Sequence, residues 1–415
     1  MSVPRIVIVG AGEAGVSAAV TLRESGYAFP ICIISDELHL PYERPPLSKD
    51  VLLSDDSEAF PLSASHSRFE ELDIYYLPGV RVTSIDRANK QVVCGNEARI
   101  NYDKLLLATG VKVRVPDIPG HEFLVTLRNY DDALRIKNCL RDKSSRLIVI
   151  GGGFIGLEVA ASARQLGCEV TLLEAAPRIL MRGVPQAIAS VVMDKHLAAG
   201  VDIRVNTSIQ RIERDEVEIL VYLASGEVLR ADCVVAGIGV LPNTELAEAA
   251  GLAVENGIAT DSTLRTSDPD IYAVGDCCSF PHALYGNKRV RLESWRTAQE
   301  HGKHVARSIL GDTAVFATTP WFWSDQYDLH IQVAGLISPM DSVIARDIGD
   351  DARMFFHLDD AGKLVGMAAV GTISKIAKDV RLGDMMIAAG AYPKPEMLAD
   401  TTLSLKKILT ASPAH

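Results

Sequence analysis

The stretch "RLIVIGGGFIGLEVA", residues 146–160, decides the fold that this sequence predicts. A run of Leu, Ile and Val precedes the glycines Gly151, Gly153 and Gly156, and a helix-like segment follows them. In this spacing the first glycine permits a tight turn, the second lets backbone approach a pyrophosphate, and the third lets helix and strand pack closely. A second strand, "EVTLLE", ends at Glu174. The pattern predicts a βαβ dinucleotide-binding unit.

The same pattern occurs once more, about 140 residues earlier, in "RIVIVGAGEAGVSAA", residues 5–19. Its glycines are Gly10, Gly12 and Gly15, and its second strand ends at Asp36. A single motif of this kind also occurs where only tight packing is needed, but two complete units make that explanation a weak one. One dinucleotide needs one such turn, so the sequence indicates two different dinucleotides, one in each of two domains.

The carboxylates that end the two second strands indicate which dinucleotides bind. Asp36 and Glu174 can each accept a ribose hydroxyl, and at Glu174 a carboxylate favours NADH because it repels the 2′-phosphate of NADPH. The downstream Arg178 and Arg182 argue against a strict preference. If one dinucleotide is NADH, the other is expected to be FAD, the commonest group that NADH reduces.

Composition excludes several classes of protein. The chain has 415 residues and a net charge of −11, which argues against a nucleic-acid partner. No apolar run approaches the ~20 residues of a membrane span, and the start does not resemble a signal peptide, so we expect a cytoplasmic protein. The seven cysteines form no C-x-x-C pair, and Cys277 and Cys278 with His282 are too few for a structural metal site, so we expect no metal.

The order of the motifs predicts an interrupted first domain. Strand ends at "YDKLLLATG", residues 102–110, and "DIYAVGD", residues 270–276, lie on either side of the second glycine motif. We therefore expect an FAD-binding domain at 1–111 and 245–315, an NAD-binding domain at 112–244, and a C-terminal domain at 316–415. Strand-like runs followed by helical material make the C-terminal domain a small α+β domain.

Several motifs together resemble the FAD-dependent ferredoxin reductases of bacterial P450 and ring-hydroxylating dioxygenase systems, of the putidaredoxin-reductase and biphenyl-dioxygenase-reductase types. They are "GAGEAG", "YERPPLSK", "LLLATG", "IGGGFIGLEVA", "AGIGVLPN", "TSDPDIYAVGDC" and "WFWSDQ", in that order along the whole chain. The resemblance implies an α/β fold with two Rossmann-like dinucleotide-binding domains, like glutathione reductase, plus the C-terminal domain. It also implies that electrons enter from NADH and leave to a [2Fe–2S] ferredoxin.

The resemblance implies the cofactor-binding residues. Arg44 would meet the adenosine-phosphate half of FAD, Lys49 the flavin ring, and Asp276 the ribityl-phosphate region. Trp295 would open a helix behind the flavin. The remaining FAD positions are Gly10, Gly12, Gly15, Asp36, Val82, Ala108, Gly110 and Arg128. The NAD positions are Gly151, Gly153, Gly156, Glu158, Glu174, Gly237, Ile238 and Gly239.

Three residues are the candidates for the catalytic centre: Lys49, Glu158 and Trp323. Glu158 lies just inside the second nucleotide helix, where a carboxylate also interacts favourably with the helix dipole. The resemblance implies that it pairs with Lys49 at the flavin–nicotinamide junction and that Trp323 covers the nicotinamide site. Alternation along a strand places Trp321 on the side of Trp323, although core packing is the ordinary fate of such aromatics.

Local chemistry around Lys49 gives two further expectations. The prolines of "YERPPLSKD", residues 42–50, are expected to forbid a helix at that point. Ser48 is then expected to act as an N-cap.

The ferredoxin is expected to be acidic and to dock on basic residues near the flavin edge. Lys303 is the leading docking candidate, and the others are Arg296, the run at 287–291 and Trp321. The alternative explanation of such a run of charges is an ordinary solvent-exposed face. We expect a monomer or weak homodimer.

Two alternatives remain open on sequence alone. An NADH-binding flavoprotein sensor resembling apoptosis-inducing factor would share this architecture. A flavin disulfide reductase or NADH peroxidase would need a reactive cysteine early in the chain, and residues 37–60 contain none.

Overall fold

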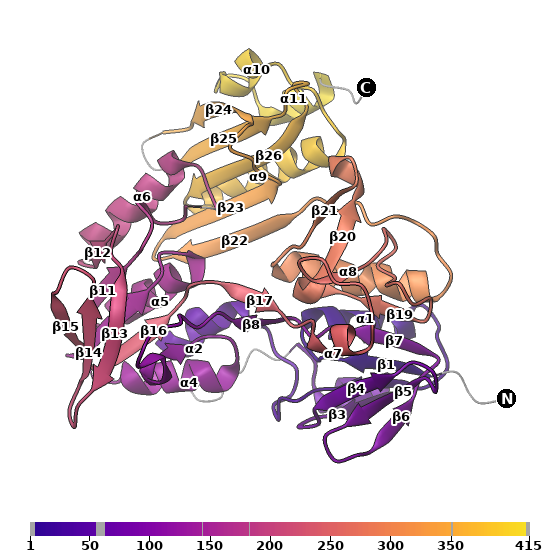
Figure 1. Cartoon of the computed structure of the whole chain (residues 1–415). Coiled ribbons are helices and arrows are strands. Elements are labelled where there is room, and N and C mark those ends of the chain that lie inside the picture. Colours follow the sequence, from indigo (N-terminus) through magenta and orange to yellow (C-terminus); the bar gives the residue numbers. More distant parts are fainter. Residues whose placement is uncertain (1–4, 55–62, 143, 182, 350–351, 412–415) are drawn as a thin grey trace. The chain divides into compact units, whose positions relative to one another are not determined.

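The structure is a computed structural model that describes residues 5–54, 63–142, 144–181, 183–349 and 352–411 (Figure 1). The chain divides into two compact units. The first unit contains Met1–Glu43, Phe60–Lys112 and Leu241–Pro320, and the second contains Arg44–Ala59, Val113–Val240 and Trp321–His415.

The first unit is built on the βαβ motif that the first glycine stretch predicts. β1 (Ile6–Val9) leads into α1 (Glu13–Glu24), and β2 (Ile31–Ile34) pairs in parallel with β1. The five-stranded sheet has the order β19-β7-β1-β2-β3, completed by β3 (Ile74–Leu77), β7 (Lys104–Leu107) and β19 (Ile271–Ala273). Its central strand β1 is a continuous run of buried Ile and Val because both faces of a parallel sheet are covered, whereas the edge strand β3 exposes Tyr75.

A small antiparallel sheet (β4-β5-β6), a small mixed sheet (β18-β20-β21) and several helices complete the first unit. The longest described helix of this unit, α8 (Trp295–Ile309), packs along α1. The other strands are β4 (Val82–Asp86), β5 (Gln91–Cys94), β6 (Arg99–Asn101), β18 (Ile258–Ala259), β20 (Cys278–His282) and β21 (Lys288–Val290). The other helices are α3 (His66–Glu71), η3 (Gly275–Cys277), η4 (Ala283–Tyr285) and α7 (Glu245–Ala249).

The second unit repeats the nucleotide motif. β10 (Arg146–Ile150), α5 (Phe154–Gln165) and β11 (Glu169–Leu173) form its βαβ motif, in a parallel sheet of order β12-β11-β10-β16-β9. The other strands of that sheet are β9 (Val125–Thr126), β12 (Asp202–Arg204) and β16 (Cys233–Ala236). Around it lie η1 (Pro45–Ser48), α2 (Asp50–Leu53), η2 (His121–Phe123), α4 (Tyr130–Cys139), α6 (Gln186–Ala198), β13 (Ile209–Arg214), β14 (Ile219–Leu223) and β15 (Val228–Ala231).

The C-terminal part of the second unit is a five-stranded antiparallel sheet with helices packed on it (orange to yellow in Figure 1). Phe356 and Met367 of the sheet form one core with Ile376 of α9. The strand order is β22 (Trp321–Gln326), β23 (Leu329–Gly335), β26 (Leu364–Gly371), β25 (Arg353–Leu358) and β24 (Ser342–Asp347). The helices are α9 (Ile373–Ala388), α10 (Pro395–Ala399) and α11 (Leu405–Ala411).

The predicted fold class is confirmed: two parallel sheets, each with a glycine-turn βαβ motif, and an α+β C-terminal part. Two of the points at which the chain passes from one unit to the other lie in β8 (Val111–Val113) and β17 (Val240–Pro242). The assignment of 1–111 with 245–315, 112–244 and 316–415 to three domains stays a prediction. In the described part of the chain, no helix combines the length and apolar character that a membrane crossing requires.

Candidate active site

The first glycine turn has the geometry of a pyrophosphate cradle. Gly10 has φ +112°, and a Cβ there would lie 2.2 Å from the carbonyl oxygen of Ala108. A Cβ on Gly15 would lie 2.1 Å from the oxygen of Gly10, so helix and strand touch at this point. A Cβ on Gly12 would meet nothing within 4 Å. Gly12 is also the N-cap of α1 and has no side chain with which to cap the helix amides, so those amides are available to an anion.

The second turn repeats this arrangement at the start of α5. A Cβ on Gly151 would lie 2.6 Å from the oxygen of Gly237, and one on Gly156 would lie 2.1 Å from the oxygen of Gly151. Around Gly153, the N-cap, the nearest atom to a Cβ would be 3.9 Å away. Both turns therefore leave an open space in front of a helix N-terminus, which is the feature that a dinucleotide requires.

The loop after β16 carries the remaining predicted NAD positions. A Cβ on Gly237 would lie 3.3 Å from the backbone nitrogen of Gly156, so this loop is in contact with the glycine turn. Ile238 is half-buried, and Gly239 has φ +104° with open space around it.

The two strand-end carboxylates differ in their surroundings. Asp36 is exposed at the end of β2. Glu174 is half-buried, and its Oε2 accepts a hydrogen bond from the amide of Gly152 at 2.7 Å while its Oε1 accepts one from Ala176 at 2.7 Å. Glu174 therefore holds the second glycine turn. Arg178 donates to four backbone carbonyls between Ile179 and Val184, so it braces that loop; Arg182 lies outside the described residues.

Lys49 lies between two carboxylates of the second unit. Its Nζ is 3.6 Å from Glu158 Oε1 and 3.4 Å from Asp325 Oδ2. The Lys49 side chain is 18% exposed and that of Glu158 is 5% exposed. The structure thus brings together Lys49 and Glu158, which are 109 positions apart in the chain numbering (158 minus 49). Their predicted pairing is present in the structure, while their catalytic role stays a proposal.

Glu158 is held by two hydroxyls as well as by Lys49. Ser48 Oγ donates to Glu158 Oε2 at 2.5 Å, and Ser324 Oγ donates to Glu158 Oε1 at 2.6 Å. Burial raises the pKa of the Glu158 carboxyl, and Lys49 and the two hydroxyls oppose that rise. A buried carboxylate whose pKa is set by opposing environments is typical of functional sites.

Trp323 is oriented by Asp325. The indole Nε1 of Trp323 donates to Asp325 Oδ2 at 3.0 Å, and His330 Nδ1 lies 2.6 Å from Asp325 Oδ1. Lys49 Nζ is 5.8 Å from the Trp323 ring centroid. Asp325 therefore ties together the cation and the indole that were predicted to act at the same place.

Trp321 and Trp323 share one face of β22, as predicted. Their rings stack with centroids 5.2 Å apart. Phe322 lies on the other face, where its ring contacts that of Phe154 in α5 at 5.1 Å. Ser324 and Gln326 follow Phe322 on this inner face, and Gln326 Oε1 lies 2.8 Å from Nε2 of the buried His196.

The predicted FAD contacts are distributed over both units. In the second unit, Arg44 Nη1 donates to the carbonyl oxygen of Arg128 at 2.6 Å, so two arginines that were predicted to contact FAD are adjacent. In the first unit, Val82 is 6% exposed and packs in the core.

Four further FAD positions lie in the first unit. Ala108 and Gly110 follow β7, and Gly110 has φ +63°. Asp276 lies in η3, and its carbonyl oxygen accepts from Arg291 at 3.1 Å. Trp295 opens α8 after the N-cap Ser294, as predicted.

The residues predicted to dock the ferredoxin already make contacts with other residues of this chain. Lys303 Nζ bonds to Glu300 at 2.8 Å and to Gln299 at 2.9 Å, and its side chain is 38% exposed. Arg296 is half-buried on the same helix. Trp321 packs partly against the core of the C-terminal sheet as well as on Trp323.

Two local predictions were wrong. Ser48 does not cap a helix, because its hydroxyl is used by Glu158, and the N-cap of α2 is Lys49. Pro45 and Pro46 do not forbid a helix either: they begin the 3-10 helix η1, where the missing amide of proline costs no hydrogen bond.

Sequence reasoning missed Ser324, Asp325 and His330. The signal for Ser324 and Asp325 was the period-2 alternation of "WFWSDQ", which places Asp325 on the face of Trp323 and Ser324 on the face towards α5. His330 had no such signal, because it comes from the neighbouring strand.

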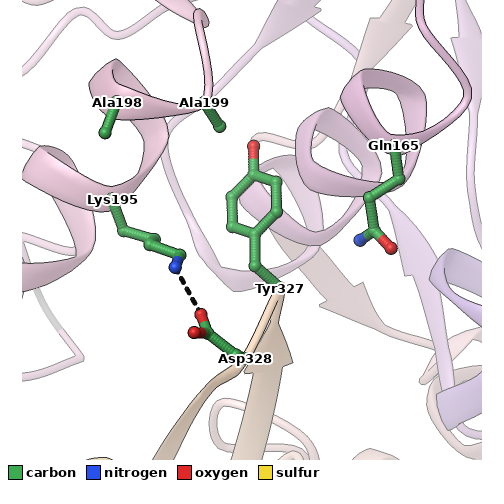
Figure 2. Close-up of a pocket in the computed structure, with 6 residues that line it drawn as sticks. All are labelled: Gln165, Lys195, Ala198, Ala199, Tyr327 and Asp328. Atoms are coloured by element: carbon green, nitrogen blue, oxygen red, sulfur yellow. Dashed lines mark ion pairs between the residues drawn. The ribbon is translucent and has the colours of Figure 1, made fainter.

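A shallow pocket lies elsewhere in the second unit, among α5, α6 and the β22–β23 turn (Figure 2). Its volume is about 460 Å³, and it contains the Lys195–Asp328 ion pair at 2.5 Å. It is lined by Gln165, Lys195, Ala198, Ala199, Tyr327 and Asp328. No predicted site residue lines it. Among the described residues, no cluster of three His, Cys, Asp or Glu side chains is arranged to hold a metal ion.

Comparison with known proteins places this geometry in a family. Residues 4–302 match the pyridine nucleotide-disulphide oxidoreductase family and residues 321–409 match the reductase C-terminal family. The chain is 39% identical over 414 residues to the ferredoxin–NAD(+) reductase component of the anthranilate 1,2-dioxygenase system of Burkholderia cepacia, covering 99% of this chain and 100% of that protein.

Two solved structures are also similar over nearly the whole chain. One is the covalent putidaredoxin reductase–putidaredoxin complex, with a TM-score of 0.92, 34% identity and 99% of each chain covered. The other is the ferredoxin reductase for the CYP199A2 system of Rhodopseudomonas palustris, with a TM-score of 0.91, 36% identity, and 97% of this chain and 99% of that chain covered. The chain therefore belongs to the pyridine nucleotide-disulphide oxidoreductase family, as an oxidoreductase with an added reductase C-terminal domain, and the resemblance expected from its sequence is confirmed.

Proposed function

We propose that this protein is an FAD-containing reductase that passes electrons from NADH to a [2Fe–2S] ferredoxin, which in turn feeds a P450 or ring-hydroxylating dioxygenase. The observation that carries the proposal is the combination of two open glycine cradles with a buried Lys49–Glu158 pair. The similarity to the Burkholderia protein, which is by name a ferredoxin–NAD(+) reductase component, also supports the proposal.

The residues present fit the two dinucleotides. Gly12 and Gly153 leave room in front of two uncapped helix N-termini, where backbone amides would hold the pyrophosphates of FAD and NADH. Arg44 and Arg128 would add positive charge on the FAD side. When bound, FAD supplies the chemistry that accepts a hydride and releases electrons one at a time.

The chain's own task is to position charge at the reacting edge. Lys49 would present a cation to the flavin ring, where it stabilises negative charge that develops on reduction. Glu158 and Asp325 hold that cation from two sides, and Ser48 and Ser324 hold Glu158. Trp323, fixed by Asp325, would cover the nicotinamide side and exclude water.

The nicotinamide dinucleotide is proposed to be NADH. Glu174 would accept the ribose hydroxyl hydrogen bonds, and its carboxylate lies against the amide of Gly152 at the start of the second turn. Arg178 is committed to backbone carbonyls, so it is a poor receptor for a 2′-phosphate.

The ferredoxin is proposed to be acidic and to dock on a basic area that includes Lys303 and Arg296, with Trp321 towards the partner. Support for a ferredoxin partner comes from the similar chain that was solved in complex with putidaredoxin. The protein is proposed to work in the cytoplasm as a monomer or weak homodimer.

Thiol chemistry is disfavoured at Cys32 and Cys278, two of the buried cysteines. Burial raises the pKa of Cys32 to about 11, and it also raises the pKa of Cys278 far above its usual range, so neither thiol forms a thiolate at neutral pH. Residues 37–60 contain no cysteine. This argues against a disulfide reductase or NADH peroxidase.

The test is NADH-driven reduction of cytochrome c by the purified holoprotein, with and without candidate [2Fe–2S] ferredoxins. The reductase predicts rapid cytochrome c reduction that depends on the ferredoxin. Tight NADH binding without ferredoxin-dependent turnover would instead support a sensor of the apoptosis-inducing-factor kind. Protein that takes up no flavin would refute both.

A further inference from the structure

His301 is a buried histidine of α8 that has no role in the proposed function described above. It is 0% exposed, and its Nδ1 accepts a hydrogen bond from the backbone amide of Gly275 at 3.1 Å. Gly275 has φ +71° and begins η3, the turn that carries Asp276. The imidazole therefore binds the backbone of the turn at the end of β19.

The ring of His301 is clamped in one orientation. It packs edge to face on Phe280, with centroids 4.7 Å apart, and on Phe316, with centroids 4.5 Å apart. Because Nδ1 accepts a hydrogen bond, the proton of the neutral imidazole is on Nε2. No hydrogen-bond partner for Nε2 occurs among the described residues, so the only directional bond of this side chain in that part of the chain is the one to Gly275.

The same point is a junction with the first nucleotide helix. A Cβ on Gly302 would lie 2.5 Å from the oxygen of Ala14 in α1, so α8 and α1 touch backbone to backbone. A Cβ on Gly275 would lie 3.1 Å from the Cβ of Ala14. The turn, α8 and α1 are thus closely packed at this point. His301 supplies a hydrogen bond that joins α8 to the turn.

We propose that His301 is a positioning residue for the FAD site: it holds the Gly275–Asp276 turn in its binding conformation before the cofactor arrives. The proposal rests on the proposed FAD function of the first glycine turn. If the bond is lost, the buried Gly275 amide is left without an acceptor, and the turn relaxes. FAD binding must then reorder the turn, which weakens the observed affinity.

Simple core packing makes a different prediction. A residue that serves only to fill space between Phe280 and Phe316 could be replaced by an apolar side chain of similar size without harm to ligand binding. A positioning residue requires the acceptor atom at the Nδ1 position. Asparagine offers an oxygen near that position, and leucine offers none, so the two substitutions separate the two roles.

The experiment measures FAD affinity of the full-length apoprotein by quenching of flavin fluorescence, with no NADH or ferredoxin present. We expect His301→Leu to raise the Kd for FAD about tenfold, which corresponds to about 1.4 kcal/mol, and His301→Asn to remain within about threefold of wild type. The control is His304→Leu, one turn along α8, whose ring also packs on Phe316, at 5.4 Å; we expect its Kd to change less than twofold.

A second measurement needs no variant. Hydrogen–deuterium exchange of the wild-type apoprotein should show the Gly275 amide protected before FAD is added. Unprotected Gly275 in the apoprotein, wild-type affinity in His301→Leu, or equal weakening by Leu and Asn would each overturn the inference. Wild-type protein that binds no FAD would overturn the proposed function together with it, whereas tight wild-type binding with no effect of His301→Leu would overturn this inference alone.

Discussion

The Lys49–Glu158 pair gives a prediction that can be worked from the structure. Lys49 Nζ lies 3.6 Å from Glu158 and 3.4 Å from Asp325. With an effective dielectric constant of about 20, each contact amounts to about 5 kcal/mol of Coulomb attraction before desolvation is subtracted. The Asp325 contact is discounted because that side chain is 33% exposed. The buried partner, Glu158, is therefore the one that depends on Lys49.

The pH dependence follows from the raised pKa of Glu158. The unfolded chain ionises this carboxyl near 4.5, whereas burial raises its pKa in the folded protein. Above pH 4.5 the folded state therefore holds more protons than the unfolded state, and the contribution of this group to stability falls as the pH rises. Lys49 limits that loss, because its charge opposes the effect of burial.

We therefore expect Lys49→Met to destabilise the protein strongly at pH 8 and only weakly at pH 5. At pH 8 the loss should be about 3 kcal/mol, the lower end for a buried charge that loses its partner. Glu158→Gln removes the charge itself and should make stability less sensitive to pH. The double variant Lys49→Met/Glu158→Gln should recover most of the loss.

The assay is thermal unfolding of the four holoproteins at pH 5 and pH 8, treated as a double-mutant cycle. Equal losses in Lys49→Met at both pH values, or no recovery in the double variant, would refute the reasoning. Asp325→Asn serves as the comparison, since it removes the other, more exposed carboxylate and should cost less than Lys49→Met at pH 8.

Three further predictions follow. Glu174→Arg should weaken use of NADH and improve use of NADPH in steady-state assays; unchanged preference would remove Glu174 from the ribose site. Burial lowers the pKa of His282 to about 4 and that of His301 to about 3, from 6.5. The stability that these two groups contribute should therefore be complete above pH 6.5 and fall towards pH 4 by about 1.4 kcal/mol per histidine per pH unit. Denaturant unfolding followed by circular dichroism at a series of pH values checks this fall. Lys303→Glu should raise the KM for ferredoxin and leave ferricyanide reduction unchanged, whereas Lys406→Glu on α11 should change neither; an unaffected KM in Lys303→Glu would exclude Lys303 from docking.

Local patterns were enough to predict the nucleotide motifs. The glycine spacings at Gly10 and Gly151 placed two turns correctly, because short-range sterics decide where only glycine fits. Alternation along β22 correctly placed Trp321 and Trp323 together. The pairing of Lys49 with Glu158 came from the family resemblance, since nothing local relates residues so far apart in the chain.

The errors have a common physical origin. Ser48 was expected to cap a helix because a serine after prolines has that local tendency. In the folded protein a buried carboxylate, Glu158, accepts its hydrogen bond instead, since a buried charge requires partners more than a helix end does.

The sequence by itself determined the α/β architecture, the two cradles and the absence of a cysteine where thiol chemistry would need one. Only the tertiary structure decided that Asp325 lies against both Lys49 and His330, and that His301 reaches the amide of Gly275. The reason is physical: periodicity and glycine sterics act within a few residues, whereas hydrogen bonds between buried side chains depend on which distant segments the packing of the core brings within about 3 Å.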